Sequence, residues 1–387
     1  MSWVTVRFED LYLIPSRNGI SVGKSDQGGS TKIINMGELF AHDLIGDIET
    51  RRVRCELHTL EKNRLLPGDL LFARRSLVAE GAGKCAMVDT VVEETVFESS
   101  IIRVRLNQRR CNPRFYNYWF RSPQGKDAIF RLVTGTNVKG IRGSELKEIR
   151  VPVPDREEQN RIADVLKAYD DLIDNSRRQI KLLEEAAQRL YREWFVEMRF
   201  PGYEDVEFVD GLPAGWTKCR LSDFAEFRRG KVITEKQTKP GTVPVVAGGL
   251  TPAYYHNASN AVAPVITVSG SGANAGYTAL YGRDIWASDC SFLDSEKTDY
   301  IYFVFLTVKV LGRGFKHLQR GSAQPHVYPS HINELEFTCP SCEVLKEFEM
   351  LVESIFKNAR VLETKIEQLQ EARDRLLPKL MSGEIEV

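Results

Sequence analysis

Basic and amide side chains recur at corresponding places in the two halves of this chain. Arg and Lys side chains suit phosphates and guanine edges, whereas Asn and Gln suit adenine edges. Any one such residue is more often an ordinary solvated surface residue, but the recurrence in both halves favours a role in nucleic-acid contact. The candidate contacts are Arg74, Arg75, Lys84, Thr136, Asn137 and Lys139 in the first half, and Arg228, Arg229, Lys231, Ser271, Asn274, Lys316, Gln324 and His326 in the second.

One short motif could indicate a methyltransferase. Asn112-Pro113-Arg114-Phe115 resembles the loop with which adenine-N6 methyltransferases hold the exocyclic amine, but its third residue is Arg. No Gly-rich motif for S-adenosylmethionine precedes it. We therefore interpret Asn112 as the N-cap, and Pro113 as the first turn, of a helix over Pro113–Ser122.

Other motifs predict neither catalysis nor a metal site. The segment Gly19–Ser25 is one residue short of a phosphate loop, and Ser269–Gly276 lacks the glycine spacing of a dinucleotide fingerprint. Cys339-Pro-Ser-Cys342 is a single CxxC, whereas zinc needs about four ligands. The histidines have no metal-ligand spacing, and no nucleophile–base pair is recognisable. We expect no catalytic residue, no metal and no cofactor in this chain, which is therefore not expected to be an enzyme.

Composition indicates a soluble protein with an uneven charge distribution. The 387 residues include 53 basic and 53 acidic residues. The helical residues 155–198 and 341–387 hold 15 basic and 21 acidic residues, so the rest of the chain keeps 38 basic and 32 acidic. This slight excess suits globules that contact DNA and helices that contact protein. The seven scattered cysteines, and the lack of a leader or long apolar run, favour reduced thiols in the cytoplasm.

The chain repeats itself at an offset of 186 residues. Gly135–Pro154 aligns with Gly321–Pro340, and the same offset continues without a gap through some forty helical residues. A duplicated globule and helix predicts a pseudo-twofold axis. Such an axis suits a bipartite target or a pair of identical partner subunits.

Both predicted long helices, residues 155–199 and 341–387, carry a heptad-like apolar seam. Alternating spacings of three and four residues persist over about four heptads, which is typical of a coiled coil. Because neither seam can stay exposed, we expect the helices, each about 60 Å long, to pack on each other rather than each on its own globule. Asp170, Asp171 and Asp174 are expected on a solvated or partner-facing stripe. The seam residues are Leu166, Tyr169, Ile173, Ile180, Leu183, Leu190, Val352, Ile355, Leu362, Ile366, Leu369 and Leu376.

The remaining chain is expected to form two globules joined by a linker. The first globule spans residues 1–154 and ends in an edge strand over Ile149–Pro154, and the second spans residues 217–340. Strands are predicted at Asp69–Ala73 and Tyr300–Leu306, among other places. Residues 200–216 are rich in Gly, Pro and acids and read as the linker.

Five segments carry a resemblance that covers essentially the whole chain. They are Val151–Gln159 (VPVPDREEQ), Leu190–Phe195 (LYREWF), Gly211–Trp216 (GLPAGW), Leu221–Lys231 (LSDFAEFRRGK) and Leu377–Ile385 (LPKLMSGEI). With the order globule–helix–globule–helix, the chain resembles a specificity subunit of a type I restriction-modification system. It departs from the family pattern at its abrupt start, Met1–Val6, and at Cys339–Glu343, where the family has Pro-x-Pro and a longer polar start.

The resemblance implies a fold and partners. The fold class would be α+β, with two mixed α/β target recognition domains separated by an antiparallel coiled coil. Each domain would read half of a split DNA site, and the helices would set the spacer and dock two methyltransferase subunits, which restriction subunits would join. S-adenosylmethionine and ATP would bind those partners. The alternative is a duplicated adaptor that scaffolds two enzymes without reading DNA; its binding would lack the steep salt dependence of phosphate contacts.

Overall fold

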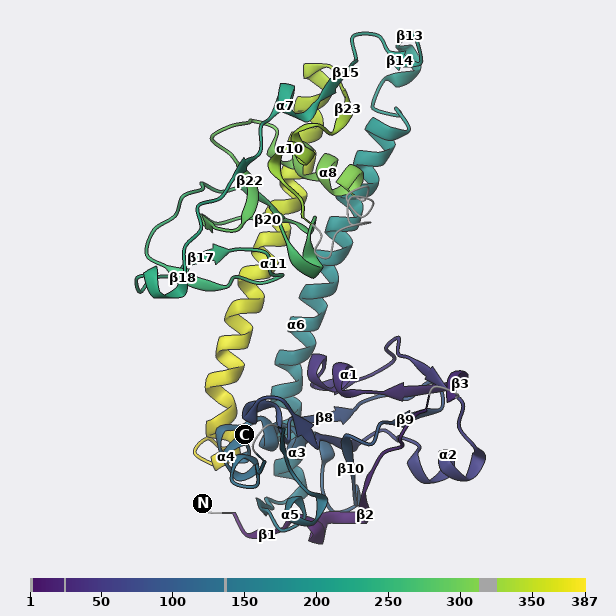
Figure 1. The fold of residues 1–387 in the computed structure, drawn as a ribbon. Helices are drawn as coiled ribbons and strands as arrows, with labels where there is room; N and C mark the ends of the chain where they lie inside the picture. Colours follow the sequence, from purple (N-terminus) through teal and green to yellow (C-terminus); the bar gives the residue numbers. More distant parts are fainter. Residues whose placement is uncertain (1–2, 24–25, 136–137, 313–325) are drawn as a thin grey trace. The chain divides into compact units, whose positions relative to one another are not determined.

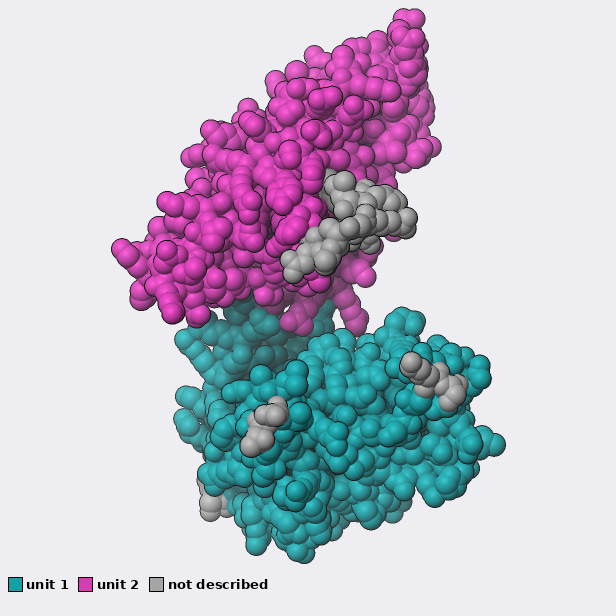
Figure 2. Space-filling view, viewed as in Figure 1, with its two compact units in different colours: residues 1–174, 367–387 teal, residues 175–366 magenta. Residues whose placement is uncertain are grey.

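The chain forms two compact units, each with its own core. The computed structural model describes residues 3–23, 26–135, 138–312 and 326–387. Unit 1 consists of Met1–Asp174 and Glu367–Val387, and unit 2 of Asn175–Ile366 (Figure 2). The division falls inside the long helices α6 (Arg156–Tyr191) and α11 (Cys342–Ser382), so each unit contains one globule and part of each helix (Figure 1).

A five-stranded sheet forms the centre of unit 1, in the order β2-β10-β6-β8-β4. All its neighbours are antiparallel except the parallel pair β4–β8. Alternate residues of the fully buried β6 enter different cores, Leu70 and Phe72 on one face and Leu71 and Ala73 on the other. The strands are β2 (Tyr12–Asn18), β4 (Leu44–Ile45), β6 (Asp69–Ala73), β8 (Cys85–Val88) and β10 (Ile101–Leu106).

Helices cover one face of this sheet and a smaller sheet lies at the other. The covering helices are α3 (Pro113–Arg121) and α4 (Pro123–Phe130). The Asn112 side chain accepts a hydrogen bond from the Arg114 amide at 2.9 Å, which confirms the N-cap predicted there. The smaller sheet, β5-β3-β9, comprises β3 (Gln27–Ile34), β5 (Arg52–Val53) and β9 (Thr95–Phe97), with α1 (Met36–Ala41) and α2 (Leu57–Asn63) beside its strands in the chain.

Unit 2 repeats much of this plan. Its main sheet has the order β16-β22-β19-β20, and a second sheet has the order β18-β17-β21. The strands of the main sheet are β16 (Arg228–Arg229), β19 (Val265–Ser269), β20 (Thr278–Tyr281) and β22 (Cys290–Asp294). Those of the second sheet are β17 (Val243–Val246), β18 (Tyr254–His256) and β21 (Trp286–Ala287).

Corresponding elements therefore follow each other in the same order in the two units. The sheet β2-β10-β6-β8 has its counterpart in β16-β22-β19-β20, and each sheet's second strand is followed in the chain by a covering helix. The antiparallel pair that joins each globule to its long helix is also repeated. It is β1 (Thr5–Arg7) with β12 (Arg150–Pro152) in unit 1, and β15 (Thr217–Arg220) with β23 (Glu336–Cys339) in unit 2. The duplication seen in the sequence is thus a duplication of structure.

One predicted strand is wrong. Tyr300–Leu306 was expected as a strand, but Ile301–Leu311 form the helix α8, whose first eight residues are all buried. A helix that is buried on all sides carries no amphipathic period, so its sequence resembles that of a buried strand. The correction makes α8 the counterpart of α3.

The two long helices run antiparallel, as each unit shows by itself. In unit 1, Arg373 of α11 lies 2.6 Å from Asp170 of α6. In unit 2, the rings of Tyr191 and Phe348, near the opposite ends of the same helices, have centroids 6.2 Å apart. In unit 1 the N-terminal part of α6 therefore pairs with the C-terminal part of α11. In unit 2 the C-terminal part of α6 pairs with the N-terminal part of α11.

None of the residues predicted to form the seam is exposed. Leu166, Ile173 and Val352 are buried, and the other nine predicted seam residues are half-buried. Leu172 and Leu182, which lie off the seam, are exposed. Residue types at period 3.5 thus separate covered from solvent-facing positions along both helices.

Asp170 does not lie on the solvated stripe on which it was expected. Its side chain is only 12% exposed, and it accepts hydrogen bonds from Tyr118 Oη at 2.7 Å and from Arg373 Nη1 at 2.6 Å. Asp171 does remain exposed and pairs with Lys167 one turn earlier. Heptad spacing alone identifies only the helix–helix face, whereas Asp170 turns toward α3 of the globule.

The segment expected as a linker is folded against unit 2. It follows the π-helical turn η4 (Arg192–Val196) and contains the hairpin of β13 (Phe208–Val209) and β14 (Leu212–Pro213). The Phe200 and Trp216 rings at its two ends stack at 4.8 Å and are both buried. The Gly, Pro and acidic composition therefore reflects tight turns rather than a free tether.

A carboxylate of α11 caps the buried helix α8. Glu349 accepts hydrogen bonds from the amides of Tyr302 and Phe303 at 2.8 and 2.9 Å. These amides have no partner within their own helix, because the first turn of a helix leaves its N–H groups free. Burial raises the pKa of Glu349 to about 7, although both backbone hydrogen bonds act in the opposite direction.

The raised pKa of Glu349 predicts a stability that falls with pH. Unfolded Glu titrates near pH 4.5, so its contribution to folding is complete below that pH and is lost as the pH rises through about 7. Between pH 5 and pH 8 we expect the unfolding free energy of unit 2 to decrease by roughly 2 kcal/mol relative to that of Glu349→Gln. Hydrogen exchange in α8 during urea unfolding measures this free energy at each pH. Parallel pH profiles for the wild type and Glu349→Gln would contradict the role of Glu349.

Candidate nucleic-acid interface

In unit 1 the candidate contacts gather where β6 leaves the sheet. Arg74 directly follows β6, and Arg75 lies in the short strand β7 (Arg75–Ser76), which pairs with β11 (Lys139–Gly140). The Ala73 amide donates to the Lys84 carbonyl at 2.9 Å, which brings Lys84 to the same end of the sheet. The structure thus brings together four predicted residues that are up to 65 positions apart in the sequence. Thr136 and Asn137 lie outside the described residues.

The close approach of β7 and β11 depends on a glycine. A Cβ atom at Gly140 would lie 2.8 Å from the Arg74 carbonyl oxygen, closer than real side chains approach. That oxygen accepts a hydrogen bond from the Ile141 amide at 3.1 Å. Any larger residue at Gly140 would push the two strands apart and displace Arg74 and Arg75.

These four cations differ in how far the protein itself engages them. Lys84 Nζ donates to the Phe40 carbonyl at 2.6 Å and pairs with Asp43 at 3.3 Å. Arg74 is half-buried and reaches the Ser99 carbonyl at 3.3 Å. Lys139 donates to its neighbouring Gly135 carbonyl at 2.8 Å.

Arg75 is the most available of the four. It is exposed, and among the residues that the structure describes it has no ion-pair or hydrogen-bond partner for its guanidinium. A free guanidinium beside three positioned cations is the chemistry that suits a phosphate or a guanine edge.

In unit 2 the candidates gather at the matching end of the main sheet. Arg228 and Arg229 form β16 and pair with Phe292 and Ser291 of β22. Ser271 follows β19 as Arg75 follows β6, and it forms an isolated antiparallel bridge with His326. The Asn274 side-chain amide reaches the Gly248 carbonyl at 3.5 Å in the same region. Lys316 and Gln324 lie outside the described residues.

Two arginines of this cluster are held by acids of the same unit. Arg228 Nη2 lies 2.7 Å from the buried carboxylate of Asp294, and its guanidinium covers the Phe292 ring at 4.7 Å. Arg229 pairs with Asp289 at 3.1 Å, an exposed contact that an incoming phosphate could replace. Lys231 is exposed and has no ion-pair partner in the part of the chain that the structure describes. Arg228 is therefore better suited to shaping the sheet end than to contacting DNA directly.

The two clusters occupy equivalent positions. Arg75 lies opposite Gly140, and Ser271 lies opposite His326, which is the residue 186 positions after Gly140. An antiparallel contact thus follows the same strand in both units. It is a two-residue ladder in unit 1 and a single bridge in unit 2, and its side chains differ. In unit 2 the His326 ring also stacks on Tyr328 at 5.9 Å, with an angle of 14° between the rings.

Sequence reasoning missed the residues that position these cations. Asp43 and Phe40 orient Lys84, Asp294 holds Arg228, and Tyr328 supports His326. Asp294 is separated from Arg228 by 66 positions and belongs to a different strand. No local spacing signals the partners of Lys84 and Arg228, because they meet only when the sheet forms.

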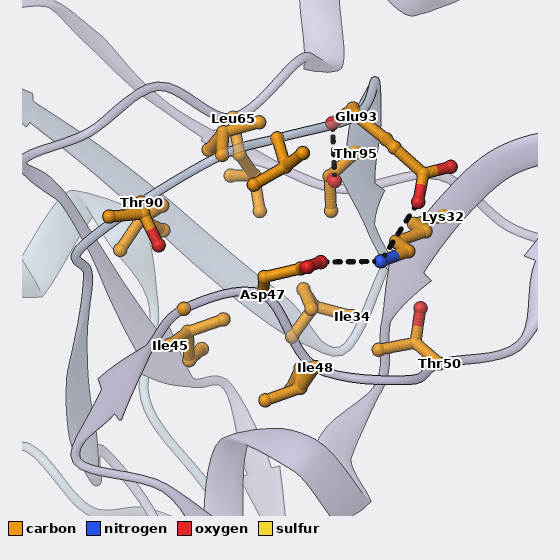
Figure 3. A pocket seen from close by; sticks show the side chains of 14 residues that line it. Lys32, Ile34, Ile45, Asp47, Ile48, Thr50, Leu65, Thr90, Glu93 and Thr95 are labelled. Carbon is orange, nitrogen blue, oxygen red and sulfur yellow. Dashed lines mark hydrogen bonds and ion pairs between the residues drawn. The ribbon is translucent and has the colours of Figure 1, made fainter.

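A small pocket elsewhere in unit 1 is a structural feature. Figure 3 shows the Lys32 ammonium between Asp47 at 2.7 Å and Glu93 at 3.1 Å. Hydrogen bonds from Arg52 and Lys32 lower the pKa of Glu93 to about 2. The free volume of about 10 Å³ accommodates no more than a water molecule. The lysine is thus neutralised by its own unit, and the pocket does not compete with the sheet ends as a ligand site.

Metal-ligand groupings are not found among the described residues. Burial raises the pKa of the Cys219 thiol to about 12, and it also raises the pKa of Cys339, the first thiol of the CxxC. Thiols held protonated are poor ligands and nucleophiles at neutral pH. In the same described part of the chain, no helix is long and apolar enough to span a bilayer.

Comparisons with known proteins agree with this architecture. A family model described as the type I restriction modification DNA specificity domain matches residues 2–185 and 213–371. The MjaIX specificity subunit of a type I restriction enzyme from Methanocaldococcus jannaschii is 25% identical over 303 residues, covering 70% of this chain and 68% of that protein. The HindI specificity subunit from Haemophilus influenzae is 22% identical, with 88% of this chain and 93% of that protein covered.

A solved structure shares the fold. The type I restriction-modification system S subunit from M. genitalium superposes with a TM-score of 0.59 at 17% identity, covering 98% of this chain and 96% of that one. The family model itself matches in two ranges, one for each globule with most of its following helix. Because these two ranges together span most of the chain, the protein belongs to the family of type I restriction-modification DNA specificity subunits.

Proposed function

We propose that this chain selects the DNA sites of a type I restriction-modification complex by reading the two halves of a bipartite sequence, one with each unit. The observation that carries the proposal is the repeated antiparallel contact at the end of each main sheet, with exposed cations in the same cluster in both units. Arg75 and Lys139 would contact one half-site, and Arg229, Lys231, Ser271, Asn274 and His326 the other. Phosphate contacts would supply affinity, and contacts to base edges would supply specificity.

The long helices would serve the complex in two further ways. Both contribute residues to both units, so their length would set the number of unspecified base pairs between the half-sites. Their outward faces carry many acids, and exposed Leu182 and Val361 provide apolar surface for protein contact. Two methyltransferase subunits would dock on the chain, in keeping with its duplication, and restriction subunits would join them.

Chemistry in this complex would belong to the partners. The methyltransferase would flip an adenine out of the duplex and methylate its N6 atom with S-adenosylmethionine, and the restriction subunits would use ATP. This chain would contribute binding and geometry but no catalytic group. A scaffold that does not read DNA would use the same helices, but it would give no role to exposed cations repeated at both sheet ends.

Charge reversal tests the proposed contacts. In the complex with its methyltransferase, Arg75→Glu is expected to weaken binding to the cognate duplex about tenfold or more, and to reduce the slope of log affinity against log salt by about one. Lys231→Glu should act similarly through the other half-site. Fluorescence anisotropy over a salt series measures both quantities.

Arg51→Glu is the matched control, since Arg51 is exposed and flanks β5, outside the candidate cluster. We expect the control to bind DNA like the wild type. Equal affinities and salt slopes for all three variants and the wild type would contradict the assignment of these cations and favour the scaffold.

Shortening the helices tests their role as a spacer. Deleting one heptad from each helix, residues 175–181 and 361–367, preserves the seam but removes about 10 Å of helix. The methylated motif should keep both half-sites while its gap shortens by at most about three base pairs. Methylation sequencing of cells that carry the deletion reads the gap directly, and an unchanged gap would contradict the spacer role.

A further inference from the structure

Four exposed apolar side chains surround Ser76 in unit 1, beside the candidate cations. Leu77 is 84% exposed, Val78 59%, Val138 50% and Phe40 40%. We call these four residues the apolar patch. Exposed apolar groups that occur singly need no explanation, whereas a cluster beside a binding surface marks a contact.

Backbone contacts make the patch one continuous surface. Ser76 pairs with Lys139, which places Val138 beside it across the ladder. The Ser76 hydroxyl accepts a hydrogen bond from the Val78 amide at 3.1 Å, which fixes the turn that exposes Leu77. A Cβ atom at Gly81 would lie 2.4 Å from that hydroxyl and 3.1 Å from the Phe40 ring, so Phe40 closes the patch on its third side.

The rim of the patch indicates its occupant. Arg75 precedes Ser76 and Leu77, Lys139 follows Val138, and the Lys84 ammonium lies on the Phe40 carbonyl. An occupant must therefore combine negative charge at the rim with an apolar group at the centre. DNA offers this combination in the major groove, where phosphates flank base edges and the C5 methyl of thymine is the apolar group on those edges.

We propose that the apolar patch, chiefly Leu77 and Val78, reads a thymine methyl group in the half-site bound by unit 1. This inference rests on the proposed DNA-reading function and names the chemistry that it selects. The described turn after β19 in unit 2 carries no such side chains. Its residues after Ser271 are Gly272 and Ala273, where unit 1 has Ser76 and Leu77 after Arg75. We therefore expect this methyl contact in the half-site bound by unit 1.

Replacing thymine by deoxyuridine tests this, because it removes the methyl group and leaves the pairing edge unchanged. The assembled methyltransferase complex should bind the cognate duplex about fourfold more weakly when one thymine of the unit 1 half-site is replaced by deoxyuridine. This loss of affinity corresponds to the burial of one methyl group. Leu77→Ala should bind the thymine and deoxyuridine duplexes equally. Deoxyuridine in the unit 2 half-site or in the gap should have no effect.

Leu57→Ala is the control variant, since Leu57 is 78% exposed on α2 of the same unit. It should keep the fourfold preference for thymine. A wild-type complex that binds its site specifically but ignores every deoxyuridine would overturn the methyl contact and leave the proposed function intact. A Leu77→Ala variant that keeps the thymine preference, but loses the methyltransferase or bends DNA less, would also overturn the methyl contact and leave the proposed function intact. A complex without any sequence-specific binding would overturn both.

Discussion

In each unit a half-buried carboxylate of a long helix binds the helix that covers the main sheet. In unit 1, Asp170 of α6 accepts hydrogen bonds from Tyr118 of α3 and from Arg373 of α11. In unit 2, Glu349 of α11 caps the first turn of α8, the counterpart of α3. Breaking a buried ion pair such as the one between Asp170 and Arg373 costs about 3–5 kcal/mol. Each covering helix is thus held both by its buried apolar side chains and by one carboxylate from a long helix.

In unit 1 this attachment extends as far as the candidate DNA contacts. Arg121 of α3 lies 3.6 Å from Asp170 and 2.8 Å from Asp43, and Asp43 lies 3.3 Å from Lys84. Alternating charges thus connect the helix pair, the covering helix and the end of the sheet. A satisfied network of charged side chains fixes the positions of its members more uniquely than apolar packing does, which suits residues that must be held in place for recognition.

The sequence was most informative where a pattern is local or periodic. The offset of 186 residues and the alternating spacing of three and four residues predicted the duplication and the paired helices, because both follow from residue order alone. The N-cap at Asn112 has a local cause as well. Tyr300–Leu306 was misread because a helix buried on all sides has no period, and Asp170 because its partners Tyr118 and Arg373 come from distant segments.

The candidate interface could be predicted only by residue type. Arg75 and Lys139, both predicted contacts, do lie on paired strands. Arg228, also a predicted contact, is instead paired with Asp294, a partner that only the folded sheet supplies. Both units keep the same strand order and differ in the side chains placed after β6 and β19. A conserved framework with variable loop ends is how one architecture can read two different half-sites.

Sequencing of N6-methyladenine in the host genome, with and without this gene, tests the central claim most directly. We expect one split motif, consisting of two short half-sites around a fixed gap, to lose methylation when the gene is absent and to regain it when the gene is restored. Charge reversal at Arg75 and Lys231 together should prevent that recovery. A methylome that does not change with the gene, in cells whose methyltransferase subunit is present and active, would contradict the proposed DNA-reading role of this chain.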